Sequence, residues 1–413
     1  MTNSVKTNSI IAMEAVRVLE NNLVAKKLVY DGYEEEFSKK VNGYKVGSTI
    51  TVRKPTDFIV RDGAVANTQD VVEGSTSIVV NKQKGIDFQF TSSELSLDIE
   101  KLSERVIQPA MVQLANQVDS DILALYSSVP NWVGTPGQAV NSFGDFFKGP
   151  ERLNELAVPM DDRYGLLSPS DHAGMLGSQT ALYIQSAAGE AYRKGSLGPI
   201  GDVDTYMSQN VPTHTVGVNT GTPLVNGASQ TSTYASVKDT WTQTLNTDGW
   251  TNSTTGILKA GDVFTIASVY AVNPVSKATL PFLRQFVVTA DANSGASTGP
   301  AALTISPPII TSGAQQTVSA APADDAPITV LGTGGTGYRQ NLVFKRNAFA
   351  FVSVPMESPE GAVNVTRKSY KGISIRLIPY YDGTNDINKW RLDILYGVKA
   401  IDPRLATRLS GTA

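Results

Sequence analysis

The sequence contains no cysteine and only two histidines, His172 and His214, among its 413 residues. Without thiols the chain cannot form disulfides, zinc–thiolate sites, iron–sulfur clusters or a cysteine nucleophile. Two histidines leave little material for a histidine-based metal site or for several acid–base pairs. These absences indicate a protein that is poor in catalytic side chains.

Charge of one sign and long apolar runs are also scarce. The 35 basic and 38 acidic side chains give a formal net charge of −3, without the basic excess that is typical of a nucleic-acid binder. No apolar run reaches the roughly 18 residues that a membrane-spanning helix needs. The polar start is followed by a stretch that Glu14, Arg17 and Glu20 interrupt, which does not fit a signal peptide. We therefore expect a soluble protein that is made in the cytoplasm.

The N-terminal part of the sequence alternates between helical and extended patterns. Apolar residues at helical spacing predict a helix over 8–29, and alternating apolar residues predict strands within 46–90. The long polar stretch between these strands predicts an extended hairpin rather than a compact core. A helical stripe from 91 to about 127 predicts a spine helix roughly 50 Å long at about 1.5 Å per residue. Pro109 lies inside it, where we expect a kink or a change of face.

The region 136–215 is predicted to mix helices and strands. A helix is expected at about 143–157, and a short strand begins at Tyr164. Ser168 and Pro169 then provide a helix cap and a favoured first helical residue.

The composition changes at about residue 216. From 216 to 341 there are about 11 charged residues, and short apolar runs alternate with turn clusters. This pattern predicts a small antiparallel barrel or sandwich. From 342 to 413 ordinary charge density returns, with strands expected at 343–354, 373–380 and 390–398. The sequence therefore predicts an α+β body that is interrupted by an all-β insertion.

Six stretches of sequence, in this order of parts, carry a resemblance to a known family: ITVRKP at 50–55, GILKAGD at 256–262, VTADAN at 288–293, NLVF at 341–344, GISIR at 372–376 and WRLDILYG at 390–397. The chain resembles the major capsid (coat) proteins of tailed bacteriophages, which have the Johnson fold. Its all-β insertion is similar to the inserted β-barrel domain of the coat proteins of short-tailed lambdoid phages.

The resemblance implies a division of the chain into an N-terminal arm at 1–45, an extended loop at 46–90, a spine helix at 91–135, an axial domain at 136–215, an inserted β-barrel domain at 216–341 and return strands at 342–413. It implies a virion protein, made in the bacterial host cytoplasm, that self-assembles as pentamers and hexamers into an icosahedral head around double-stranded DNA. Scaffolding, portal and decoration proteins are the implied partners. DNA would be contacted only non-specifically, and no membrane is involved. The family has no catalytic, cofactor or metal residues to carry over, so we expect no enzyme.

Two patterns resemble catalytic or nucleotide sites, and each has a structural alternative that we favour. The glycine-rich segment 331–337 follows a predicted strand but precedes another strand, whereas a phosphate loop must open a helix. Ser168, Asp171 and His172 include the residue types of a hydrolytic triad, but adjacent residues at a helix start point in different directions. His214 has no carboxylate close in sequence, and we assign it no role.

Other polar patterns are interpreted as turns or solvated charges. Residues 291–295 provide the first oxygen ligands of a calcium loop without the later ones, and 381–386 predict a hairpin turn. Some phage shells cross-link lysine to asparagine between neighbours, a role imaginable for Lys54, Lys82 or Lys84. We favour solvated or ion-paired lysines instead.

Opposite charges cluster near the arm, at Glu34–Glu36 and Lys39–Lys40. We interpret them as a solvated face, with contact to a neighbouring subunit or a scaffolding partner as the alternative. Two other function classes remain open at this point, a β-rich phage tail or surface binding protein and a hydrolase that uses His172. Within the shell class, an encapsulin-like nanocompartment shell protein is the alternative, and the inserted domain argues against it.

Overall fold

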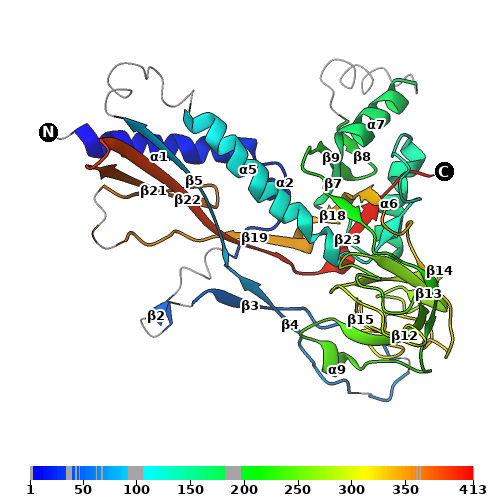
Figure 1. Ribbon diagram of the computed structural model, residues 1–413. Coiled ribbons are helices and arrows are strands. Elements are labelled where there is room, and N and C mark those ends of the chain that lie inside the picture. Colours follow the sequence, from blue (N-terminus) through cyan, green and yellow to red (C-terminus); the bar gives the residue numbers. More distant parts are fainter. Residues whose placement is uncertain are drawn as a thin grey trace. The chain divides into compact units, whose positions relative to one another are not determined.

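The computed structural model describes residues 3–33, 40–41, 44–45, 47–61, 63–66, 68–91, 106–181, 197–359, 361 and 364–412. The chain forms two compact units, each assembled from separate stretches of sequence (Figure 1). Unit 1 comprises Met1–Thr51, Ser77–Leu123 and Phe349–Lys399, and unit 2 comprises Val52–Thr76, Ala124–Ala348 and Ala400–Ala413.

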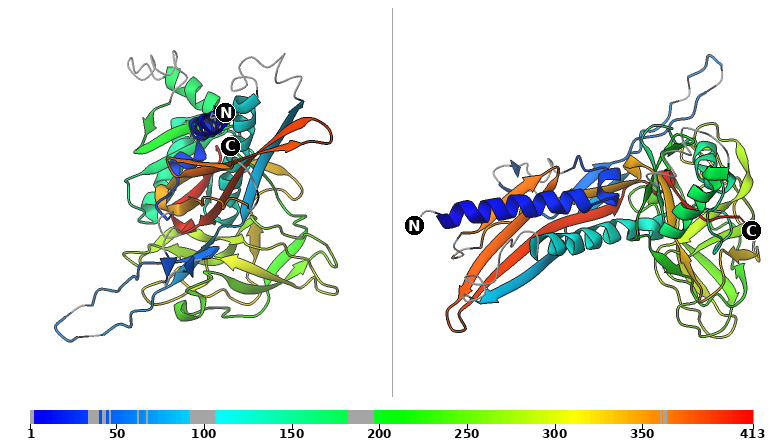
Figure 2. Two further views of the ribbon diagram at one scale, coloured as in Figure 1. Left: turned by 90° about the vertical axis from the view of Figure 1, so that its left-hand side faces the viewer. Right: turned by 90° about the horizontal axis from the view of Figure 1, so that it is seen from above.

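Unit 1 consists of a long antiparallel sheet and helices packed on it (Figure 2). The helices are α1 (Asn3–Asn22), α2 (Ala25–Leu28) and α5 (Gln108–Leu123). The sheet has the order β19-β22-β21-β20, and β5 pairs with β22. Its strands are β19 (Phe349–Ser353), β22 (Ile387–Ala400), β21 (Ile373–Asp382), β20 (Thr366–Tyr370) and β5 (Lys82–Thr91).

The N-terminal helix predicted over 8–29 is divided in two. The helix α1 ends at Asn22, and α2 begins at Ala25. The carboxylate of Asp119, on α5, accepts hydrogen bonds from the backbone amides of Val24 (2.7 Å) and Lys26 (3.3 Å). These amides would be satisfied within one continuous helix, so the distant carboxylate acts as a cap that starts a new one.

The predicted hairpin over 46–90 is correct for its first part only. Strands β3 (Thr49–Arg53) and β4 (Ser75–Val79) form a two-stranded sheet. The following strand β5 instead pairs with β22 along its whole length, from Thr91↔Ile387 to Lys82↔Tyr396. Phe88 and Phe90, the aromatic residues of the alternating pattern, pack edge-on against Trp390 with ring centroids 5.4 and 5.9 Å away. This packing stabilises the long-range pairing.

The described part of the predicted spine helix is α5, followed by a 3-10 turn, η2 (Ala124–Ser128). Residues 92–105, where the stripe begins, lie outside the described residues. A short π-helical turn at 106–107 directly precedes α5, and Pro109 lies in the first turn of α5. The irregularity therefore lies where the apolar stripe was predicted to change face.

The body of unit 2 is a six-stranded sheet with two helices. The strand order is β6-β23-β18-β7-β9-β8. The strands are β6 (Trp132–Val133), β23 (Ala406–Leu409), β18 (Asn341–Lys345), β7 (Arg163–Leu167), β9 (Val203–Met207) and β8 (Pro199–Ile200). The predicted helix at 143–157 is confirmed as α6 (Phe143–Glu155), which Ser142 caps by accepting the Asp145 amide at 3.1 Å. The prediction of one continuous strand at 343–354 is wrong, because a 3-10 turn (Arg346–Ala348) separates β18 from β19.

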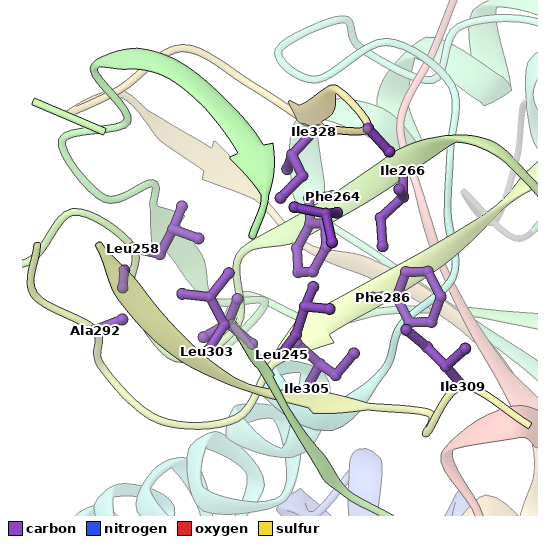
Figure 3. Packing of buried hydrophobic residues seen from close by; sticks show 14 of the residues in the cluster. Leu245, Leu258, Phe264, Ile266, Phe286, Ala292, Leu303, Ile305, Ile309 and Ile328 are labelled. Atoms are coloured by element: carbon purple, nitrogen blue, oxygen red, sulfur yellow. The ribbon is translucent and has the colours of Figure 1, made fainter. Parts of the chain in front are cut away.

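The insertion folds as a nearly closed six-stranded antiparallel barrel of order β11-β12-β15-β14-β13-β16. The strands are β11 (Gly221–Val225), β12 (Gln243–Trp250), β15 (Ala301–Ser306), β14 (Thr279–Val288), β13 (Val263–Val272) and β16 (Ile328–Val330), with the short helix α9 (Tyr234–Val237) between β11 and β12. A bridge between Leu224 and Pro327 joins the two edge strands. Leu245, Phe264 and Phe286 fill the interior, and the two phenylalanine rings stack at 5.7 Å (Figure 3).

The two ends of the insertion are paired with each other. Strand β10 (Thr213–Thr215) forms an antiparallel ladder with β17 (Gly337–Arg339). The amide of Gln340 also donates to the carbonyl of Pro212 at 2.9 Å. The barrel therefore leaves and re-enters the body at one place, as an inserted domain requires.

Candidate functional site: an extended loop and the base of the barrel

The residue types of a hydrolytic triad are adjacent but are not arranged as one. Ser168 caps α7 (Pro169–Ala181) and lies 2.5 Å from an Asp171 carboxylate oxygen. The same carboxylate accepts from the Val140 amide and the Asn341 side chain, both at 2.8 Å. The ring of His172 makes no hydrogen bond to Ser168 or Asp171, and burial lowers its pKa. Asp171 therefore joins the start of α7 to Val140 and Asn341, and it does not orient the His172 ring as a general base.

The glycine-rich segment 331–337 connects β16 with β17, and no helix follows it. The amide of Gly335 donates to the carbonyl of Val216 at 3.1 Å, and the Thr333 amide donates to the Tyr338 hydroxyl at 2.9 Å. The segment thus lies against the start of the insertion. It leads from the barrel strand β16 to β17, as expected of a return linker, and it does not open a helix.

The oxygens of the calcium-like segment are occupied by backbone amides. Asp291 accepts from Ala260 at 2.8 Å, and Asn293 accepts from Gly256 at 2.7 Å. The predicted turn at 381–386 joins β21 to β22. Across the described ranges, no group of three or more His, Cys, Asp or Glu side chains is arranged to hold a metal ion.

Two of the three hairpin lysines, Lys82 and Lys54, have partners within their own unit. Lys82 makes an ion pair with Asp121 at 3.1 Å, and the Lys54 ammonium lies 5.9 Å from the ring centroid of Trp241. Of the two charge clusters near the arm, the acidic one at 34–36 and Lys39 lie outside the described residues, and Lys40 begins β1 (Lys40–Val41).

A loop that projects from β3 and β4 displays apolar side chains to solvent. From here on, the name extended loop is used for residues 54–74 only, the part of the expected 46–90 region that lies between β3 and β4. Its described apolar residues with large exposed fractions are Phe58 (58%), Ile59 (43%), Val60 (92%), Val65 (84%) and Val71 (65%). A monomeric protein rarely exposes so many neighbouring apolar groups, so this surface is suited to contact another protein.

Polar contacts within the extended loop fix its path. The side chain of Gln69 bridges the backbone of Ile59, accepting from its amide at 2.9 Å and donating to its carbonyl at 2.6 Å. At the base, the Lys54 amide donates to Gly74 at 2.8 Å, and Asp239 accepts from the amide and hydroxyl of Ser75 at 2.9 and 2.7 Å. The loop is therefore held extended without a core of its own.

A buried polar network lies at the base of the barrel. His214 Nε2 is 2.7 Å from Asp262 Oδ1, and the Tyr126 hydroxyl is 3.0 Å from His214 Nδ1. A carboxylate can only accept, so in the neutral ring Nε2 carries the proton and Nδ1 accepts from Tyr126. Burial raises the pKa of Tyr126, which keeps its hydroxyl a donor. The second oxygen of Asp262 accepts from the amides of Gly217 (3.0 Å) and Lys259 (2.7 Å).

No role was predicted for His214, because no carboxylate lies close to it in the sequence. Its partner Asp262 lies 48 residues away. The pairing of β10 with β17 and the start of β13 bring the two side chains together. Nearby, Gln285 exchanges two hydrogen bonds with the backbone of Trp132, at 2.8 and 2.7 Å. These contacts tie the barrel to the strand β6. The network is a structural joint, and it presents no reacting group to solvent.

Among the described helices, none combines the length and the apolar character needed to cross a membrane.

Comparison with known proteins identifies the family. Residues 1–411 match the family described as P22 coat protein, gene protein 5. The chain is 23% identical over 345 residues to the major capsid protein of Acyrthosiphon pisum secondary endosymbiont phage 1, covering 80% of each chain.

Two solved structures are also similar. One, from Mycobacterium phage Che8, has a TM-score of 0.48 and 12% identity, covering 94% of this chain and 90% of that chain. The other, the CUS-3 coat protein I-domain, has 28% identity and a TM-score of 0.19, covering 27% of this chain and 96% of that chain. The family match, which spans nearly the whole sequence, decides between the predicted alternatives in favour of a phage shell protein without enzymatic activity. The chain belongs to the P22 coat protein family and is a major capsid protein of the phage head.

Proposed function

We propose that this capsid protein forms pentamers and hexamers of an icosahedral shell, in which the extended loop of each copy lies on a neighbouring copy. The observation that carries the proposal is the exposure of Val60 and Val65, at 92% and 84%. Burying a valine side chain contributes roughly 1.5–3 kcal/mol. Small contributions of this kind add up when each contact recurs around a closed lattice.

The N-terminal arm is the second proposed contact. On α1, Ile10 is 66% exposed and Met13 is 36% exposed. With Lys368 and Tyr370 they line an open groove of about 700 Å³. A groove with a mixed apolar and charged lining is suited to a neighbouring copy or to a scaffolding protein during assembly.

The remaining parts of the chain take the roles expected of this family. The inserted barrel, residues 216–341, lies on the outer surface of the shell, and the body of unit 2 forms the axial domain. The shell also contacts portal and decoration proteins, and it meets packaged DNA only non-specifically. The near-neutral charge of the chain supports this last point, since a strongly basic inner wall would grip the DNA.

Paired charge substitutions in the extended loop test the proposal. We expect Val60→Asp combined with Val65→Asp to leave the unassembled subunit as stable as the unchanged protein, because both side chains are exposed. Assembly should fail, because two carboxylates would have to be desolvated at each contact. The matched control is Val60→Ile with Val65→Ile, which keeps the surface apolar. Sedimentation of each variant with its scaffolding protein is the measurement, and normal shells from the Asp variant would contradict the proposal.

A further inference from the structure

Unit 2 contains a buried arginine whose Nε has no hydrogen-bond partner among the described residues. Arg284, on β14, is 6% exposed, and its Nε makes no hydrogen bond. Burial, with a smaller effect from Arg152 and Arg404, lowers the pKa of Arg284 to about 9. The group still carries its positive charge at neutral pH. An unpaired buried charge is strongly destabilising, so its retention requires an explanation.

Arg408, another buried arginine of unit 2, provides a contrast, although its Nε and Nη2 likewise make no hydrogen bond. Arg408 donates to the carbonyl of Gly261 at 2.7 Å, and it lies over the rings of Tyr126 and Trp132 at 5.2 and 5.7 Å. Carbonyl and aromatic contacts of this kind stabilise a buried cation. No comparable contact is found for Arg284 within the described part of the chain.

Arg284 lines a small cavity whose wall has an excess of positive charge. The cavity has a volume of about 30 Å³, and its other charged lining residues are Lys277, Arg404 and Asp57. Arg404 is neutralised by Asp402, which accepts from its Nε at 2.9 Å and from its Nη2 at 2.8 Å. Its Nη1 lies 3.9 Å from Asp57.

Lys277 has hydrogen bonds but no neutralising partner of its own. Its ammonium donates to the backbone carbonyls of Pro274 and Ala314. Asp57 is the acidic residue on the cavity wall, and its side chain is 40% exposed. One carboxylate therefore faces Lys277, Arg284 and the already paired Arg404. One positive charge remains uncompensated.

We propose that this cavity is a binding site for a small inorganic anion of the size of chloride, held by Arg284 and Lys277. A water molecule needs roughly 10–15 Å³ of such volume, so the cavity holds about two or three water-sized atoms. Chloride fits this space, whereas the five non-hydrogen atoms of phosphate do not. The bound anion supplies the negative charge that the neighbouring side chains lack.

Unfolding of the full-length, unassembled chain in urea tests the proposal, with chloride replacing gluconate at constant ionic strength. A ligand that binds only the folded state raises the ratio of folded to unfolded protein up to tenfold for each tenfold increase in concentration above its Kd. We expect this response to chloride in the unchanged protein. It should disappear in Arg284→Met and persist in Arg339→Met, which removes an exposed arginine of β17.

The variants also separate anion binding from a merely structural role. In gluconate, Arg284→Met should be at least as stable as the unchanged protein, because it removes an unpaired buried charge. Equal chloride responses in the two proteins would overturn the proposal, as would stabilisation by phosphate but not by chloride.

If Arg284→Met does not fold, anomalous diffraction from crystals of the unchanged protein grown in bromide shows whether a halide ion binds in the cavity. An anomalous peak beside Arg284 is expected. A site without a peak would overturn the proposal.

Discussion

Replacing Asp262 with alanine should weaken the joint between the barrel and the body more than any exposed aspartate substitution. The carboxylate is fully buried and accepts three hydrogen bonds, from the His214 side chain and from the amides of Gly217 and Lys259. Alanine leaves these donors without an acceptor. The joint then loses the contacts that hold the first residues of the insertion.

The size of the effect follows from the burial of the donors. An unsatisfied buried donor costs about 1–3 kcal/mol. The His214 and Gly217 donors are buried, while the Lys259 amide is only part-buried and can be reached by water. Two buried donors at about 2 kcal/mol each give a loss of about 4 kcal/mol in the free energy of unfolding. This is a large fraction of the roughly 5–15 kcal/mol that stabilises a typical domain.

Urea unfolding followed by tryptophan fluorescence is the assay, and Asp291→Ala is the matched control. Asp291 lies on the same barrel but is exposed, and it accepts one amide hydrogen bond, from Ala260. We expect the control to lose about 1 kcal/mol or less. The loss in the free energy of unfolding for Asp262→Asn should lie between those of Asp262→Ala and Asp291→Ala, because asparagine keeps one of the two acceptor oxygens. A loss for Asp262→Ala within about 1 kcal/mol of the control would show that these hydrogen bonds do not stabilise the joint.

Two further predictions concern Asp119 and the independence of the barrel. Burial raises the pKa of Asp119 to about 6, so the folded state binds more protons than the unfolded state between about pH 4 and 6. The free energy of unfolding should therefore fall by about 3 kcal/mol as pH rises through this window, a slope that urea titrations at several pH values should find absent in Asp119→Asn. Residues 216–341 expressed alone should unfold cooperatively and give dispersed β-type amide resonances, because the barrel has its own hydrophobic core. A disordered fragment would show that the boundary is wrong.

Local signals in the sequence were sufficient for the short-range elements. Ser142 and Ser168 both cap the helices predicted to follow them, because a cap depends on residues three positions apart. The change of composition at 216 predicted the all-β insertion, because charge density and turn clusters are properties of neighbouring residues, although they do not give the strand order in which β12 pairs with β15. These features depend on neighbours in the chain, so their patterns are visible without the structure.

Long-range contacts could not be predicted in this way. The pairing of β5 with β22 joins Lys82 to Tyr396, and alternation alone does not name a strand's partner. Likewise, Asp119 caps a helix start that lies 95 residues away in the sequence. The network of His214 and the uncompensated charge of Arg284 also depend on residues that only the fold brings together. The family resemblance predicted the architecture but none of these side-chain contacts.

Electron microscopy of particles formed by the full-length chain with its scaffolding protein shows whether the extended loop joins neighbouring subunits in a closed shell. We expect closed icosahedral shells in which the extended loop of each subunit covers a neighbouring subunit and the inserted barrel lies on the outer surface. Subunits that remain monomers or small rings under every assembly condition would contradict this expectation. Shells in which residues 54–74 contact no neighbour would contradict it as well.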